Sequence, residues 1–280
     1  MVAQKKPFKV GSLLKREDRN LAAILLAKGE IGGIFNRGVC ALWFDGGNLK
    51  AVRKIWKIKG EGRKGRPVAL TIGSEEFVPM IDENALSEKV RNLLYAPDFK
   101  QRVGSLCFIR APLKASYQNL LPDHAKSFEA EGICMIQNWD PHGHDPTEQF
   151  LDEARRLGVK HPAVTSMNIT GEREIVDQNE GKNFCQDHHI PIFLNDPQAH
   201  PKHLGSYTIF TFGAHGIRLE RDGNIPGKFF ENIFGMPVDM EVTKKPNYPQ
   251  LEFPPPLFEN LTGSKLREAI LLYLKGQADV

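Results

Sequence analysis

Short apolar runs alternate with helical segments along most of this chain, and this alternation restricts its possible folds more than any other feature. Residues 67–72 (PVALTI), 105–109 (SLCFI) and 163–165 (AVT) favour buried strands, because they are apolar runs bounded by glycine, proline or charge. Residues 18–28 and 147–157 carry apolar positions at helical spacing. The pattern indicates an α/β fold, with helices on the faces of a sheet and functional loops at strand ends.

Capping residues mark several helix boundaries. Asp45 and Asn48 can cap a helix that ends near Gly60, and Thr147 is expected to cap a helix that stops before Gly158. Further strands are predicted within 31–44 and 132–137, and further helices within 84–94 and 264–274.

A proline-rich segment divides the last part of the chain from the rest. Residues 244–257 (KKPNYPQLEFPPPL) hold five prolines, which favours an extended connector over a helix. We therefore predict an α/β domain over residues 15–230. Residues 231–280 are predicted to form a C-terminal extension with this connector and a terminal helix.

Composition excludes several classes of protein. A chain of 280 residues with 41% hydrophobic and 25% charged residues is globular rather than disordered. It contains neither the apolar core of a secretory signal nor a stretch of about 20 apolar residues that could span a membrane. Its four cysteines are far apart and form no CxxC pair, which predicts a reduced, soluble, cytoplasmic protein.

The formal net charge is only +3, so evidence for an anionic partner depends on where the charge lies. Residues 50–66 (KAVRKIWKIKGEGRKGR) carry eight cations and one acid, Glu61, together with three glycines. Glycines let backbone N–H groups approach an oxyanion, and lysine and arginine neutralise it, so phosphate is the expected ligand. Lys50, Arg53, Lys54 and Lys57 are interpreted as a solvated helix face, and Lys59, Arg63 and Arg66 as the anion-binding residues.

A second polar segment, HPAVTSMNITGE, follows the predicted strand at 163–165. In an extended segment Ser166 and Asn168 face the same side and Met167 faces the other. Hydroxyl and carboxamide groups are suitable ligands for phosphate, ribose or carbonyl oxygens. Taken alone, the segment could equally be a helix-capping turn.

Five segments in the same order resemble those of the YrdC-like threonylcarbamoyl-adenylate synthases. TSMNITGE resembles the family's threonine-serine-alanine-asparagine-leucine-serine-glycine segment. WFDGGNLKAVRKIWKIKG resembles the helix that enters its lysine-glycine-arginine-proline loop, and PVALTI the strand that follows. FIRAP and LERDGNI resemble its arginine-x-proline strand end and its late arginine-proline-glycine. The resemblance spans roughly residues 20 to 227, and its order is more specific than any one motif.

The resemblance implies a twisted mixed sheet flanked by helices around a large basic concave cavity. It implies a nucleotidyltransferase that binds ATP with magnesium, threonine and bicarbonate. The product in such enzymes is threonylcarbamoyl-AMP, used to make threonylcarbamoyladenosine in tRNA. Positioning and charge neutralisation would carry the catalysis, without a protein nucleophile.

Site residues follow from the resemblance one at a time. Lys59, Ser166 and Asn168 match the family's lysine, serine and asparagine. The family's loop arginine falls on Glu61, which leaves Arg63 or Arg66 in its place. The remaining candidates are Arg110 and Arg221 for the nucleotide or its phosphates, and Thr165 for the substrate.

The clearest departure from the family lies at residues 35–42 (FNRGVCAL). The family has proline-threonine-glutamate-threonine-x-tyrosine-glycine-leucine there, and only Leu42 matches. The loss of these hydroxyls predicts weak or absent use of threonine, with Asn36 and Arg37 as candidates to bind a different carboxylate or a phosphate. The alternative is a non-catalytic paralogue that binds a nucleotide, tRNA or double-stranded RNA.

Histidines gather in three segments and suggest a rival function, a metal-dependent hydrolase. None of the segments places two histidines four residues apart on a helix, and loop histidines near prolines are commonly surface residues. We therefore expect no metal site. The segments are PHGHD (His142, His144), QDHH (His188, His189) and HPKH (His200, His203).

Overall fold

The computed structural model describes residues 8–36, 38–126, 132–196, 204–241, 246–253, 258 and 260–275. Within these residues the strands form one mixed sheet in the order β1-β8-β2-β3-β7-β4-β6-β5-β9-β10-β11. The strands are β1 (Lys9–Ser12), β2 (Gly32–Asn36), β3 (Val39–Asp45), β4 (Ala69–Leu70), β5 (Cys107–Pro112), β6 (Met135–Trp139), β7 (Pro162–Ser166), β8 (Ile192–Asn195), β9 (Thr208–Gly213), β10 (Gly216–Arg221) and β11 (Val238–Asp239).

Helices cover the sheet, so the predicted α/β class is confirmed. None of the helices described is long and apolar enough to cross a bilayer. The α-helices are α1 (Arg16–Ala27), α2 (Leu49–Lys59), α3 (Ser74–Phe77), α4 (Glu88–Leu94), α5 (Phe99–Val103), α6 (Ala115–Gln118), α7 (Asp145–Arg156), α8 (Gln178–Asp187), α9 (Lys228–Phe234) and α11 (Gly263–Leu274). Short 3-10 turns include η1 (Glu61–Arg63) after α2.

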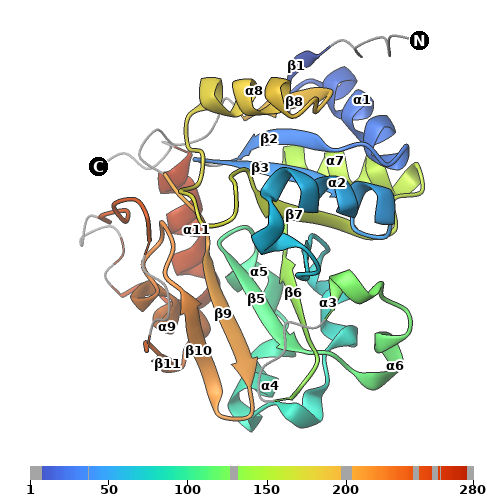
Figure 1. Cartoon of the computed structure of the whole chain (residues 1–280). Helices are drawn as coiled ribbons and strands as arrows, with labels where there is room; N and C mark the ends of the chain where they lie inside the picture. The colour runs from blue at the N-terminus through green and yellow to red at the C-terminus, as the bar shows by residue number, and fades with distance from the viewer. Residues whose placement is uncertain are drawn as a thin grey trace, which may run out of the picture.

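The sheet is strongly curved. In Figure 1, β2 and β3 run across the view, whereas β5, β6, β9 and β10 run down it. Four strands separate β3 from β9 in the sheet order, yet the backbone N–H of Gly205, just before β9, donates to Gly38 O in the β2–β3 turn at 3.1 Å. The curvature thus brings the two halves of the sheet together and creates a concave face between them.

Side-chain alternation along β3 supplies two separate cores. Ala41 and Trp43 face α1 and α7, where Trp43 packs edge-on against Phe150. Leu42 and Phe44 face the opposite side, in a cluster with residues of α2 and α8. β3 is therefore apolar almost throughout, because its side chains pack into a core on each face of the sheet.

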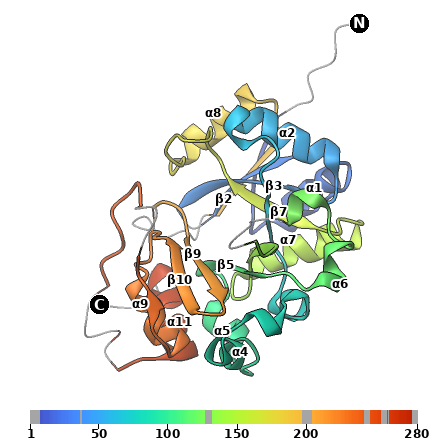
Figure 2. The same ribbon diagram turned by 60° about the horizontal axis from the view of Figure 1, so that its bottom comes forward.

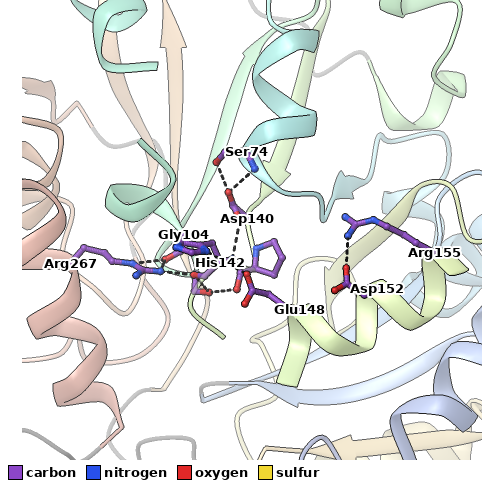
Figure 3. A network of polar contacts seen from close by, with 10 residues as sticks. Ser74, Gly104, Asp140, His142, Glu148, Asp152, Arg155 and Arg267 are labelled. Atoms are coloured by element: carbon purple, nitrogen blue, oxygen red, sulfur yellow. Dashed lines mark hydrogen bonds and ion pairs between the residues drawn. The ribbon is translucent and has the colours of Figure 1, made fainter. Parts of the chain in front are cut away.

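The C-terminal helix belongs to the core of the second half of the sheet. The predicted domain boundary after residue 230 falls inside α9, and α11 packs against α5 and α9 (Figure 2). Its buried Arg267 donates to Gly104 O at 3.1 and 2.9 Å and to His142 O at 2.5 Å (Figure 3). The terminal helix predicted within residues 231–280 is present, and its apolar face closes this core; the domain boundary at residue 230 stays a prediction.

The helix boundaries show where capping was assigned correctly. The Asn48 side chain accepts from the backbone N–H groups of Lys50 and Ala51 at the start of α2, and Gly60 ends that helix with a φ of 81°. The assignment of Thr147 as a cap was wrong. Helix α7 begins at Asp145, and Thr147 is a buried residue of its first turn whose hydroxyl contacts His144.

Candidate functional site

A cavity of about 280 Å³ lies on the concave face where the two halves of the sheet meet. In the order of the sheet, every strand from β2 to β10 contributes to its wall, and β8 does not. The loops that follow α2 and β7 complete it. The lining residues are Asn36, Val39, Ala41, Trp43, Lys59, Arg63, Ala69, Phe108, Arg110, Gln137, Trp139, Val164, Thr165, Ser166, Asn168, Thr170, Gly171, Ser206, Tyr207, Ile209 and Arg221.

Lys59, the last residue of α2, is 4% exposed and reaches the segment after β7. Its ammonium donates to Ser166 O at 2.6 Å, Asn168 O at 3.0 Å and Asn168 Oδ1 at 2.9 Å. These bonds match the three donors of an ammonium group. The geometry shows Lys59 shaping the Ser166–Asn168 segment and placing a positive charge beneath it.

The polar segment after β7 has the alternation expected from its sequence. Ser166 and Asn168 both line the cavity, whereas Met167 is fully buried in the core on the other side. Ser166 Oγ donates to Asn168 Oδ1 at 2.7 Å, and Asn168 Nδ2 donates to Glu172 O at 2.8 Å. The segment is therefore a rigid polar edge of the cavity rather than the start of a helix.

The two candidate loop arginines lie in different environments. Arg63 lies in η1, lines the cavity and donates to Pro67 O at 2.6 Å. Burial, with Arg66 nearby, lowers the pKa of Arg63 to about 10, so it stays charged at neutral pH. Arg66 is exposed and lies outside the lining, so Arg63 is the one of the two alternatives that lines the cavity, and phosphate binding by Arg66 stays a prediction.

Two further arginines line the part of the cavity formed by β5 and β10, its Arg221 end. Arg110 on β5 donates to Gln137 Oε1 at 3.1 Å and lies 3.5 Å from Glu220 Oε2. Arg221, at the end of β10, donates through Nε and Nη2 to Tyr207 O at 3.1 and 2.7 Å. Burial lowers the pKa of Arg221 to about 10, while the nearby carboxylate of Glu174 raises it.

The three predicted substrate residues have different positions. Asn36 lines the cavity, is 4% exposed, and its Oδ1 has no hydrogen-bond partner among the described residues. Thr165 also lines the cavity but pairs with Leu42, so its side chain is directed away from the face of Ser166. Arg37 falls outside the residues that the structure describes.

Aromatic residues form a floor that was not predicted as part of the site. Trp43 packs edge-on against Trp139 with ring centroids 6.3 Å apart, and Trp139 contacts Tyr207 at 5.7 Å. Tyr207 also packs on Phe108. The indole N–H groups of Trp43 and Trp139 are buried without hydrogen-bond partners in the part of the chain that the structure describes. Period-two alternation marks these residues as facing one side of a strand, but only the curvature shows that this side encloses a cavity.

Glu174, in the loop after β7, is a second residue that the sequence motifs did not reveal. Its buried carboxylate accepts from Ser206 Oγ at 2.7 Å and Asn247 Nδ2 at 2.6 Å. Burial raises its pKa, but the hydrogen bonds from Asn247 and Ser206 and the charge of Arg221 outweigh this and hold the pKa below its ordinary value. Glu174 thus connects three segments beside the Arg221 end of the cavity.

The histidine segments do not converge. His142 lies 3.4 Å from Glu148, whereas His144 is buried and contacts Asp196 and Thr147 at 2.9 and 2.7 Å (Figure 3 shows the His142 region). His188 and His189 follow α8. His200 and His203 lie outside the described residues, and among those described no three His, Cys, Asp or Glu side chains are placed to hold a metal ion.

Charge in the cavity is of one sign. Four of its lining residues are cations, Lys59, Arg63, Arg110 and Arg221, and none of the described lining residues is acidic. Cations in a partly enclosed cleft focus a positive potential, because the surrounding protein screens less than water does. Such a potential favours a ligand with negative charge.

Solved structures with low sequence identity share this fold. No family model and no curated protein matches the sequence. Among solved structures, a variant of Sua5 from P. abyssi is 15% identical with a TM-score of 0.60, covering 82% of this chain and 65% of its own. P. abyssi Sua5 complexed with L-threonine gives 15% identity and a TM-score of 0.57, covering 84% and 64%.

E. coli YciO is 13% identical with a TM-score of 0.55, covering 78% of this chain and 94% of its own. The chain therefore has the twisted YrdC-like α/β fold shared by Sua5 and YciO, as a divergent example of it. It spans slightly less than two thirds of the length of the two Sua5 structures.

Proposed function

We propose that this protein binds ATP with magnesium in the cavity and is a divergent relative of the threonylcarbamoyl-AMP synthases. The observation that carries the proposal is the collection of Lys59, Arg63, Ser166 and Asn168, from two segments about a hundred residues apart, at one end of a cavity without acidic side chains. The similarity to Sua5, which was solved complexed with L-threonine, supports it.

The reaction would proceed without a protein nucleophile. An amino group and bicarbonate form a carbamate with loss of water. A carbamate oxygen then attacks the α-phosphorus of ATP, the bond between the α-phosphorus and the bridging oxygen breaks, and diphosphate leaves. Arg63 and the positive charge of Lys59 would stabilise the charge that develops on the phosphates. Because the described lining offers no carboxylate, magnesium would be held by the phosphates and water.

ATP with magnesium should raise the melting temperature of the protein, since a ligand that binds the folded state stabilises it. Arg63→Gln should abolish most of this shift, because Arg63 lines the cavity. The matched control is Arg66→Gln, which alters an exposed arginine three residues away and should keep the shift. The absence of a shift at millimolar ATP in the unmodified protein would contradict a nucleotide site.

Activity is a separate question from binding. We expect weak or absent threonine-dependent release of diphosphate with ATP, bicarbonate and magnesium, because the cavity-facing residues of β3 are Val39, Ala41 and Trp43 rather than hydroxyl-bearing ones. Release at the rate of Sua5 run alongside, abolished by Asn168→Ala, would show an ordinary synthase.

A second candidate function is the binding of tRNA or double-stranded RNA by a non-catalytic paralogue. It is favoured by the exposed cations of α2 and the loop that follows, Lys50, Arg53, Lys57, Lys64 and Arg66. If the protein binds RNA through its phosphates, the logarithm of the binding constant should fall linearly with the logarithm of the salt concentration. Each phosphate contact removed by mutation should reduce the magnitude of this slope by about 0.7 to 0.9. Affinity for an RNA duplex that does not change with salt would exclude this function.

A further inference from the structure

The two ends of the cavity differ in charge. At the loop end Lys59 and Arg63 line the cavity, and none of the described lining residues there is acidic. At the other end Arg110 and Arg221 line the cavity, but Glu220 lies 3.5 Å from Arg110 and the carboxylate of Glu174 lies near Arg221, which offsets much of their charge. A polyphosphate suits the first end, whereas the second matches a ligand with a single negative charge, such as a carboxylate.

The surface between the two ends is apolar. On β3, Val39, Ala41 and Trp43 alternate toward the cavity, and cross-strand pairing places Val164 beside Trp43 and Ala69 beside Val164. Phe108 and Arg110 lie two residues apart on β5 and thus face the same side, so an apolar wall adjoins the arginine end. Ile209 pairs with Phe108 and continues this wall.

This apolar surface includes two buried polar groups. The indole N–H groups of Trp43 and Trp139, each residue 2% exposed, have no acceptor among the residues that the structure describes. Because both nitrogens are shielded from solvent, they offer no contact to a ligand, and the tryptophans present only their apolar atoms to the cavity. The wall is therefore suited to an apolar group, and the adjoining arginines to an acceptor such as a carboxylate.

We propose that the amino-acid substrate of this site has an apolar side chain, aliphatic or phenyl-sized, in place of the hydroxyl-bearing side chain of threonine. Its carboxylate binds at the Arg110–Arg221 end, and its side chain packs on Val39, Ala41, Trp43 and Phe108. This inference rests on the proposed nucleotide-binding function, because the triphosphate occupies the loop end and leaves the arginine pair to the amino acid.

Binding can be measured directly, because two of the three tryptophans of the chain line the cavity and their emission reports occupancy. The full-length protein is titrated with leucine, phenylalanine and threonine, each with and without ATP and magnesium. Leucine or phenylalanine should bind at least tenfold more tightly than threonine, since hydrophobic contact in a pocket is worth about that much. Leucinamide, which lacks the carboxylate, should bind at least tenfold more weakly than leucine.

Val39→Thr tests the wall with little change in size. It should reduce the preference for leucine over threonine several-fold, because it introduces a hydroxyl among apolar residues. Val238→Thr is the matched control: Val238 is similarly buried at 6% exposure but lies on β11 outside the lining, so its variant should keep the preference.

Four results would overturn the inference. Threonine binding as tightly as leucine would do so, and so would equal binding of leucine and leucinamide. An ATP-induced rise in melting temperature without binding of any amino acid would overturn the inference alone and leave the nucleotide site standing. The absence of both ATP and amino-acid binding would overturn the inference together with the proposed function.

Discussion

At the scale of single residues, Lys59 has a structural role in addition to the one its motif suggests. The sequence predicts a cation that binds phosphate, whereas the structure shows an ammonium that donates to three oxygens of the Ser166–Asn168 segment. A buried lysine held by three acceptors rigidifies both segments and still contributes its charge to the cavity. Lys59 therefore fixes the position of the polar segment that lines the cavity.

Replacing this ammonium should destabilise the protein. Lys59→Met keeps the length of the side chain but leaves the carbonyl groups of Ser166 and Asn168 without their donor, which costs about 1–3 kcal/mol for each buried polar group left unpaired. Urea unfolding should show a lower midpoint with an unchanged slope.

The control for this variant is Lys57→Met, two residues earlier on the exposed side of α2. It should change the free energy of unfolding by no more than about 0.5 kcal/mol. Equal midpoints for the two variants would show that the hydrogen bonds of Lys59 do not contribute to folding.

At the scale of elements, the close approach of chain segments forms the Arg221 end of the cavity. Gly223 follows β10 and lies against the backbone before β9, where a Cβ atom would overlap Thr208 N and Tyr207 C. The same turn places the guanidinium of Arg221 on Tyr207 O. A glycine is required here because a side chain would push β9 and β10 apart.

Gly223→Ala should therefore destabilise the protein by about 1–3 kcal/mol, the range for overpacking against neighbours that cannot move easily. Because the turn also positions Arg221, the variant should weaken amino-acid binding more than ATP binding. Gly213→Ala provides the control, since a Cβ there meets nothing within 4 Å. Thermal unfolding of both variants gives the comparison, and equal stability would contradict the close approach.

At the scale of the whole molecule, the C-terminal helix and the second half of the sheet form one core. Leu266, Ile270 and Leu274 of α11 are almost fully buried among residues of α5 and α9. Arg267 fixes the same helix to the loops at Gly104 and His142 (Figure 3). A helix that supplies this much apolar contact is part of the cooperative unit.

Ile270→Ala should lower the free energy of unfolding by about 2–5 kcal/mol, the cost of a cavity at a fully buried position. The transition should remain single by both fluorescence and circular dichroism, because the helix unfolds together with the sheet. Leu272→Ala, at an exposed position of the same helix, is the control and should have little effect. A separate early transition in the Ile270 variant would show that α11 folds independently.

The sequence by itself determined the α/β class, several helix and strand positions, and the polar half of the cavity. These follow from local rules: apolar periodicity sets the elements, Asn48 caps α2, and alternation along residues 166–168 turns Ser166 and Asn168 to one side. It did not predict β1, β8 or the β9–β10 hairpin, whose residues were not separated from the loops around them.

Only the tertiary structure decided which arginine of the loop reaches the cavity, where α11 packs, and which apolar residues of β3 form its floor. Arg63 and Arg66 are chemically equivalent in sequence, and the turn of η1 directs one inward and the other into solvent. From the sequence alone Trp43 cannot be distinguished from a core residue, because any buried strand has apolar residues at such positions. It becomes part of a site because the sheet curves until β9 meets the β2–β3 turn, a long-range contact that no local pattern encodes.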